Sequence, residues 1–185
     1  MPVPQGSDGD RLLTHLGYEV RWTSWVLEMP KGTSIAPQSI PEGYTLRDLR
    51  PGDERTAYQV IENAFSEWPE RTPTTYEDWA AGAVLRPGFE PWQMRLMEDG
   101  TGTVVGAGFV ILSRECGYVD QLAVRKDHRG LGLARALLVD SFELARSRGA
   151  TRSELSTDSR TGALGLYERV GMEVTSTWLH RAIEV

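Results

Sequence analysis

The sequence predicts an α/β protein of the α+β kind, with a mixed, mostly antiparallel central sheet flanked by helices. Two observations predict this class. Strand-like stretches follow one another directly between residues 92 and 125, with turn signals between them, as in antiparallel hairpins. After residue 125, helix-like and strand-like stretches alternate. A chain of 185 residues can bury one substantial core and is too short for two full domains.

The N-terminal residues 1–43 are expected to form an extension before the main domain. Residues 1–10 are polar and are expected to be disordered, and residues 30–43, rich in Pro, Gly and Ser, predict a linker. Between them, residues 12–29 predict the end of a helix, a cap at Gly17 and a strand rich in aromatic and β-branched residues.

The main domain is expected over residues 44–185, and each of its elements has a local signal. Alternating or β-branched stretches predict strands, and apolar residues three and four apart predict helices. Asp99-Gly100 predicts a hairpin turn, and the clearest apolar stripe begins near Leu131 and ends near Gly149. The expected strands cover residues 44–49, 92–97, 103–112, 117–125, 153–157 and 174–183, and the expected helices 53–65, 76–84, 131–149 and 161–170.

The two ends of the chain contain a partial internal repeat. Aligning Gly17 with Gly171 also aligns Glu19 with Glu173, Val20 with Val174 and Thr23 with Thr177. Two helix-glycine-strand segments can resemble each other by chance. The preferred interpretation is that residues 1–43 hold the remnant of a second copy of the main domain that lacks its ligand-binding part.

Composition narrows the function classes. The net charge is −6 and basic residues are scattered, so no basic face for a nucleic acid is expected. The longest apolar runs are too short for a membrane span, and the polar N-terminus has no signal-peptide pattern. Cys116 is the single cysteine, which excludes an internal disulfide and fits a reducing compartment, so a cytoplasmic protein is expected.

One motif points to a phosphate-bearing ligand. The segment RKDHRGLGLARALL joins a predicted strand to a predicted helix, and its glycines Gly130 and Gly132 leave backbone N–H groups open at the helix N-terminus, where an anion is favoured. A Walker A loop is absent, and the Rossmann pattern fails at the bulky Arg135. The pattern R/Q-x-x-G-x-G/A is matched by Arg129, Gly132 and Ala134. Taken alone, the motif is equally compatible with a glycine-rich turn that binds nothing.

Two segments in the same order, GYVDQLAVRKDHRGLGLARALL and STDSRTGALGLYERVGMEV, closely resemble the GNAT (GCN5-related N-acetyltransferase) superfamily. The resemblance covers residues 44–185 and is strongest over 117–174. It implies a sheet splayed at the coenzyme site, acetyl-CoA as cosubstrate, and no metal. The N-terminal extension resembles part of a second GNAT domain, as in tandem members such as the mycothiol synthases.

The resemblance also implies a set of coenzyme-binding residues. The backbone of the central strand is expected to bond the pantetheine arm and to polarise the acetyl carbonyl, and the glycine turn is expected to hold the pyrophosphate. Many members place asparagine near the turn before the last helix. This sequence has Asp158, Ser159 and Arg160 at these positions, so it departs from the family pattern at the contact with the pantetheine arm. The implied residues are Leu122, Ala123, Val124, Arg129, Gly130, Leu131, Gly132, Leu133, Ala134, Arg135 and Asp158.

The catalytic candidates follow from the same resemblance. Tyr167 stands where the family places a tyrosine that protonates the departing thiolate, and the alternative is a tyrosine that only closes the core. Asp120 is the candidate base for the acceptor amine, with Glu115 as second choice. The alternative is that Asp120 is structural and water takes the proton.

The predicted function is transfer of an acetyl group from acetyl-CoA to a primary amine of a small molecule or protein, directly in a ternary complex, by a monomer or homodimer. The alternative is a non-catalytic acyl-CoA sensor. Residues 66–80 combine acidic and aromatic side chains, which either bind a cationic amine or form an ordinary solvated surface. The acidic and aromatic residues are Glu67, Trp68, Glu70, Tyr76, Glu77, Asp78 and Trp79. The sequence does not identify the acceptor or the length of the acyl chain.

Overall fold

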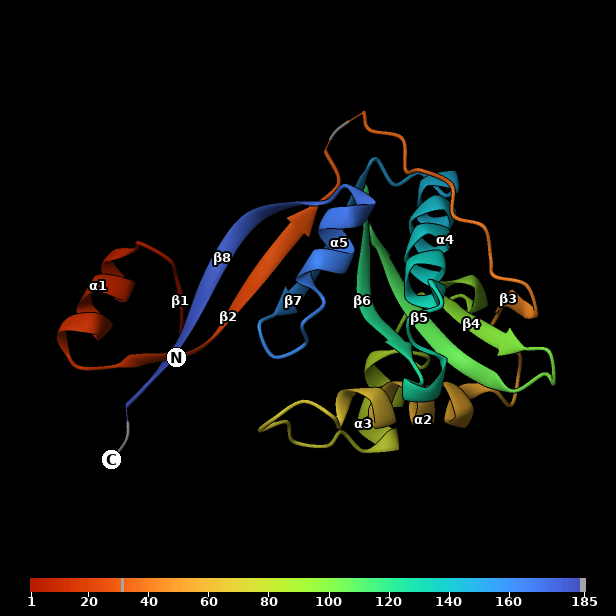
Figure 1. Cartoon of the computed structure of the whole chain (residues 1–185), viewed down its shortest axis with the longest axis horizontal. Coiled ribbons are helices and arrows are strands. Elements are labelled where there is room, and N and C mark those ends of the chain that lie inside the picture. The colour runs from red at the N-terminus through yellow and green to blue at the C-terminus, as the bar shows by residue number, and fades with distance from the viewer. Residues whose placement is uncertain (31, 184–185) are drawn as a thin grey trace. The chain divides into compact units, whose positions relative to one another are not determined.

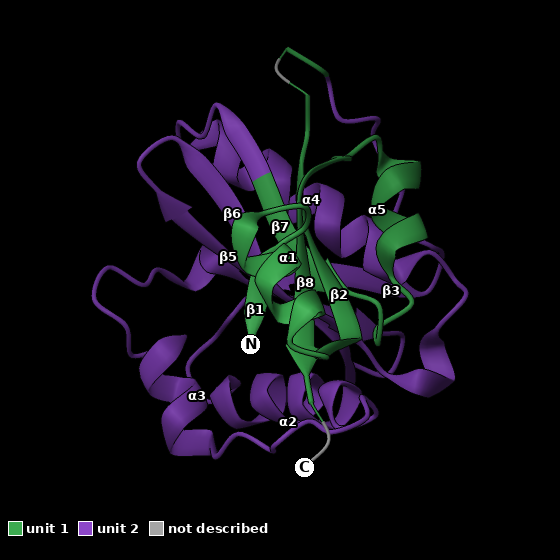
Figure 2. Ribbon diagram, turned by 90° about the vertical axis from the view of Figure 1, so that its left-hand side faces the viewer, with its two compact units in different colours: residues 1–33, 154–185 green, residues 34–153 purple. Residues whose placement is uncertain are grey.

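A computed structural model describes residues 1–30 and 32–183, which form two compact units (Figure 2). Unit 1 combines Met1–Thr33 with Glu154–Val185, and unit 2 is Ser34–Ser153. Lys31 of the predicted linker and residues 184–185 at the end of the predicted main domain lie outside the described residues. Most of the extension, up to Thr33, therefore folds together with the last elements of the chain, whereas residues 34–43 belong to unit 2. The division into a 1–43 extension and a 44–185 domain stays a prediction.

The predicted mixed α/β class is confirmed, with the expected strands and helices shifted at their ends by a few residues. The predicted turn at Asp99 is also confirmed, because the Asp99 carboxylate accepts a hydrogen bond of 2.9 Å from the Thr101 N–H. In unit 2 the elements are β3 (Tyr44–Asp48), α2 (Glu54–Phe65), α3 (Tyr76–Gly82), the 3-10 turn η1 (Pro91–Gln93), β4 (Met94–Asp99), β5 (Val104–Ser113), β6 (Cys116–Val124), the 3-10 turn η2 (Lys126–His128) and α4 (Leu133–Ser147).

The strands of unit 2 are antiparallel in the order β6-β5-β4-β3. Helix α4 covers one face of this sheet, and α2 and α3 lie on the other (Figure 1). Each face has its own core, because successive strand residues point to opposite sides. Phe109 packs in the core on the α2 side, and Leu137 packs in the core on the α4 side; both side chains are fully buried.

Glycines allow α4 to lie close to the sheet. A Cβ at Gly117 of β6 would stand 2.6 Å from the Cβ of Ala145, and one at Gly106 of β5 would stand 2.9 Å from Leu137. No real side chain fits at such distances. The small residues of β5 and β6 therefore fix the position of α4, and with it the turn that precedes this helix.

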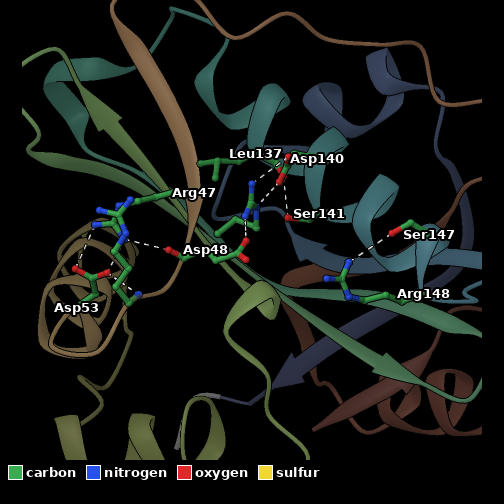
Figure 3. Close-up of polar contacts among 10 residues, drawn as sticks. Arg47, Asp48, Asp53, Leu137, Asp140, Ser141, Ser147 and Arg148 are labelled. Atoms are coloured by element: carbon green, nitrogen blue, oxygen red, sulfur yellow. Dashed lines mark hydrogen bonds and ion pairs between the residues drawn. The ribbon is translucent and has the colours of Figure 1, made fainter.

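Two arginine-centred ion pair clusters tie the edge of this sheet to its helices (Figure 3). Arg47 of β3 holds Asp53, just before α2, at 2.5 Å and Glu98 of β4 at 2.6 Å. Arg95 of β4 is buried and pairs with Asp48 of β3 and, at 2.5 Å, with Asp140 of α4.

In unit 1 the strands are antiparallel in the order β1-β8-β2-β7. The elements are β1 (Pro2–Pro4), α1 (Asp8–His15), β2 (Glu19–Glu28), β7 (Arg152–Asp158), which starts at the end of unit 2, α5 (Leu164–Val170) and β8 (Glu173–Ala182).

The prediction that residues 1–10 are disordered is wrong. Strand β1 pairs with β8, and the Ser7 side chain caps α1 by accepting a hydrogen bond from the Asp10 N–H. The Asp10 carboxylate also pairs with Arg181 of β8 at 2.7 Å. Polar composition misled the prediction, because these polar groups bond to the C-terminal strand.

The internal repeat is visible in the strand register of unit 1. With Gly17 aligned on Gly171, both glycines have positive φ, +81° and +99°, and each lies between a helix and a strand. The alignment makes the pair Val3–Leu179 equivalent to the pair Thr157–Trp25, and both pairs are present. The repeated helix-glycine-strand structure is thus confirmed, and its origin in a duplicated domain stays a prediction.

Candidate functional site

The turn between β6 and α4 exposes backbone donors. Gly130 and Gly132 have φ of +79° and +83°, a region that favours glycine. Within the described part of the chain, no atom lies within 4 Å of the position that a Cβ would take at either glycine. Gly132 is the N-cap of α4 and has no side chain to bond the helix end. The first N–H groups of α4, from Leu133 to Arg135, have no partner within the helix. The turn is therefore suited to an anion at the positive end of the helix dipole.

The side chains around this turn fit a phosphate-bearing group. Nε of Arg135 is buried and, among the described residues, has no hydrogen-bond partner. Leu133 is buried and anchors the turn in the α4-side core, whereas Leu131 is half exposed and Ala134 partly buried. A buried donor without a partner, together with an open helix N-terminus, is suited to a pyrophosphate group.

Arg129, which the resemblance places among the coenzyme-binding residues, is bonded to protein atoms on two sides, and its contact with the coenzyme stays a prediction. Its Nε donates to the Val124 carbonyl at 3.0 Å, and its two terminal nitrogens each bond the Glu67 carboxylate at 2.9 Å. Arg129 thus joins the end of β6 to the loop after α2. The same pair holds the pKa of Glu67 below its usual range.

Strand β6 contains a β-bulge at Asp120. Gln121 lies opposite Phe109 and Val119 opposite Val110, so Asp120 has no partner residue in β5. Gly117 faces α4, whereas Gln121, four residues later, faces α3 and bonds Trp79. In a regular strand, side chains four residues apart point to the same face, so Gly117 and Gln121 would share one. The extra residue at the bulge shifts the alternation by one position, so that Gln121 points to the opposite face.

The Asp120 carboxylate is electrostatically unusual. It is open to solvent, yet desolvation by the surrounding protein raises its pKa, and the nearby positive charge of Arg86 only partly opposes this. Arg86 follows α3, so the carboxylate lies on the α3 side of the sheet, as Gln121 does. A carboxylate with a raised pKa, at a bulge, is suited to accept a proton.

The second candidate base lies elsewhere. Glu115 is in the turn between β5 and β6, where its carbonyl accepts hydrogen bonds from Thr151 and Arg152 and its carboxylate bonds the Thr151 hydroxyl at 3.2 Å. Five residues of strand, about 16 Å, separate it from Asp120. We therefore retain Asp120 and not Glu115 as the candidate base.

The three predicted strand residues lie at the end of β6, opposite β5. Leu122, Ala123 and Val124 pair with Gly108, Ala107 and Gly106. Ala123 and Val124 are buried on opposite faces of the sheet. Their backbone contacts to the pantetheine arm stay a prediction.

Asp158 and Tyr167 belong to unit 1. Asp158 pairs with Arg160 at 2.5 Å and accepts a bond of 2.9 Å from the Arg160 N–H. Neither Asp158 nor Ser159 caps α5, which starts after Ala163 without a side-chain cap. Tyr167 is 8% exposed, and burial raises the pKa of its phenol to about 12. Its role as an acid stays a prediction.

Most side chains of residues 66–80 that were considered for a cationic amine are engaged in the structure. Trp68 stacks on Phe65 with ring centroids 4.3 Å apart, and Trp79 is 5% exposed in the α2-side core. Glu67 is held by Arg129, and the Asp78 carboxylate accepts from Thr75 at 2.7 Å. The structure therefore favours the interpretation of this region as an ordinary surface over a core.

Sequence reasoning missed Gln121 and Arg86. The Gln121 Oε1 accepts a hydrogen bond of 2.9 Å from Trp79 Nε1, and Nη1 of Arg86 is buried without a partner among the described residues. Strict alternation along β6 would put Gln121 on the α4 side with Gly117, and nothing in the sequence marks the bulge that puts it on the α3 side. A glutamine directly after the candidate base was the only available signal.

The bulged strand, the glycine turn and the open helix end define an α/β protein whose turn before α4 is suited to a phosphate-bearing ligand. The family model of the acetyltransferase (GNAT) family matches residues 54–172. The chain therefore belongs to this family, whose members use acetyl-CoA as cosubstrate.

Relatives agree with this assignment. The chain is 31% identical over 170 residues to a mycothiol acetyltransferase of Thermobispora bispora, covering 87% of this chain and 57% of the relative. It is 33% identical to one of Salinispora arenicola, covering 86% and 54%. A crystal structure of a GCN5-related N-acetyltransferase from Sphaerobacter thermophilus superposes with a TM-score of 0.86 at 33% identity, covering 98% of this chain and 58% of that one. The chain thus spans little more than half the length of these relatives.

The described residues contain neither a metal site nor a membrane-spanning helix. No group of three or more His, Cys, Asp or Glu side chains there is arranged to hold a metal ion. Within the same residues, every helix is too short or too polar to cross a bilayer.

Proposed function

We propose that this protein is an acetyl-CoA-dependent N-acetyltransferase that modifies a primary amine. The observation that carries the proposal is the turn at Gly130 and Gly132, which opens the N-terminus of α4 beside the unpartnered Nε of Arg135. Backbone amides and the helix dipole are pre-arranged there for the coenzyme's phosphates.

The proposed reaction is direct transfer. Asp120 takes a proton from the acceptor ammonium, and the neutral nitrogen attacks the thioester carbonyl, so that a C–N bond forms and the C–S bond breaks. As the amide forms, its nitrogen gives its surplus proton to solvent, and the leaving thiolate takes a proton from the Tyr167 hydroxyl. Solvent then reprotonates Tyr167 and takes the proton from Asp120, so the products are the amide, the CoA thiol and one proton. Cys116 has no place in this scheme, because no covalent intermediate on the protein is needed.

The relatives suggest where an acceptor search begins. Several are named mycothiol acetyltransferases, so amines related to mycothiol are the first acceptors to test. A monomer or homodimer in the cytoplasm stays a prediction from the sequence.

Calorimetric titration with acetyl-CoA tests the coenzyme site. Gly132→Glu puts a carboxylate and a strained backbone into the turn, so micromolar binding of the wild type is expected to be lost. Gly102→Glu is the matched control, because Gly102 has a similar φ of +82° and equally open surroundings in the β4–β5 hairpin. Absence of binding to the wild type, or equal binding by both variants, would contradict the proposal.

Thiol release in an amine screen separates the enzyme from the alternative. Turnover that depends on an added amine supports the transferase. Tight acetyl-CoA binding without release of thiol for any amine would indicate the acyl-CoA sensor instead.

A further inference from the structure

Gln121 presents two hydrogen-bond donors beside the candidate base. Trp79 Nε1 can only donate a hydrogen bond, so the atom of Gln121 that lies 2.9 Å from it must be the amide oxygen. The amide NH2 therefore points away from Trp79. Among the described residues this NH2 group has no protein acceptor.

Trp79 holds this orientation firmly. Its ring is 5% exposed and packs at 5.7 Å, between ring centroids, on Tyr58 of α2. Rotation of the Gln121 amide would bring two N–H groups together and leave the buried indole donor without a partner, which is costly. The hydrogen bond from Trp79 thus holds the Gln121 amide in one orientation, as expected for a group that binds a ligand.

Arg86 supplies a second donor on the same side of the sheet. Its Nη1 is buried and has no partner among the described residues, and its positive charge acts to lower the pKa of Asp120. Phe89, three residues later, packs near Phe109 in the core on the α2 side, with ring centroids 6.2 Å apart. A guanidinium nitrogen enclosed by protein without an acceptor is unfavourable unless a ligand supplies one.

We propose that Gln121 and Arg86 form a subsite for an oxygen atom of the acceptor, next to the amine that Asp120 deprotonates. The acceptor class is then an amine with a carbonyl, carboxylate or hydroxyl oxygen close to the nitrogen. Simple alkylamines and polyamines would leave both donors unpaired, and a site built to bond an oxygen rejects molecules that lack it. This inference rests on the proposed acetyltransferase function.

Two matched amines test the subsite. L-Alaninamide carries a carbonyl next to its amine, and sec-butylamine has a similar shape without an oxygen. Affinity of each for the protein–CoA complex is measured by NMR titration, and kcat/KM with acetyl-CoA follows where turnover occurs. Wild type is expected to favour alaninamide by about tenfold or more, the effect of one or two charge-assisted hydrogen bonds.

Variants assign this preference to Gln121. Gln121→Met keeps the length of the side chain and removes its donors, so the preference is expected to fall about tenfold while CoA affinity stays unchanged. Trp79→Phe releases the amide and is expected to give an intermediate preference. Trp92→Phe is the control, because Trp92 is also 5% exposed and donates to Glu90 at 3.2 Å, outside the proposed subsite.

Each outcome bears on a separate claim. Equal affinity of the wild type for both amines, or an unchanged preference in Gln121→Met, overturns the subsite while CoA binding still supports the proposed function. Failure of the wild type to bind CoA overturns the proposed function, and the subsite falls with it.

Discussion

Arg129 in the glycine turn and Glu67 in the loop after α2 form a two-point ion pair, with both nitrogen–oxygen distances at 2.9 Å. Because Arg129 also bonds the Val124 carbonyl, three segments of unit 2 meet at one guanidinium. The pair puts a negative charge beside a turn that is otherwise suited to an anion. An anion bound in this turn would therefore interact electrostatically with the loop after α2.

Glu67→Gln is expected to strengthen acetyl-CoA binding a few-fold. The substitution removes a carboxylate next to the phosphate site and leaves Arg129 with its full charge, and the effect is modest because both side chains are more than a third exposed. Calorimetry at low and high salt measures it, with the gain largest at low salt. Glu77→Gln, an exposed acid of α3, serves as control; equal affinities would show that Glu67 and the coenzyme do not interact.

Asp120→Asn is expected to lower kcat/KM by about 10²–10⁴-fold, the usual contribution of a general base. Because desolvation raises the pKa of Asp120, the wild-type kcat/KM should fall, as pH decreases, at a pH above the ordinary 3.8 of an aspartate. In the Asp120→Asn variant, this fall of kcat/KM at low pH should be absent. A profile of unchanged shape would mean that water takes the proton.

The same variant is expected to be at least as stable as the wild type at pH 7. A pKa raised in the folded state means that ionising Asp120 costs folding free energy at pH values above its unfolded pKa, and asparagine removes that cost. Thermal unfolding at pH 7 measures this. Asp127→Asn is the comparison, since the pKa of that exposed carboxyl is lowered by Arg125 and its loss should not stabilise.

Tyr167→Phe is expected to reduce kcat more than it changes acetyl-CoA affinity, because the hydroxyl acts on a thiolate that exists only after the bond breaks. Burial raises the pKa of Tyr167 to about 12, so the phenol stays protonated through neutral and mildly alkaline pH. If kcat of the wild type falls between pH 8 and 10, ionisation of Tyr167 is not the cause, and the Tyr167→Phe variant should show the same fall. An unchanged kcat would leave Tyr167 as a core residue.

The sequence was informative where a local pattern has a single physical meaning. Gly130 and Gly132 form the predicted turn between a strand and a helix, and the structure adds that both have positive φ. Gly171 ends α5 as a left-handed cap. The elements of the main domain follow apolar periodicity, which burial on two faces of one sheet enforces.

What the sequence could not reveal depends on pairing between distant segments. The bulge at Asp120 exists only relative to β5, and it alone puts Gln121 on the α3 side. The partner of Arg129 lies far away along the chain at Glu67. Residues 1–10 likewise adopt a defined structure because they contact β8, where Arg181 forms an ion pair with Asp10.

Arg47→Met is expected to destabilise unit 2 by about 3 kcal/mol, because it leaves Asp53 and Glu98 without their shared cation. The side chains of Arg47, Asp53 and Glu98 are only 13%, 21% and 18% exposed. Arg47 holds the pKa of Asp53 below 3.8, so this pair stabilises the fold above that pH, and its contribution disappears as pH falls through the lowered pKa. Chemical unfolding of both proteins at pH 7 and near pH 3 measures the difference, which should shrink in acid. Arg125→Met, which breaks an exposed pair with Asp127, is the control and should cost less than about 1 kcal/mol. A loss for Arg47→Met as small as the control, or one independent of pH, would show that the cluster does not stabilise the fold.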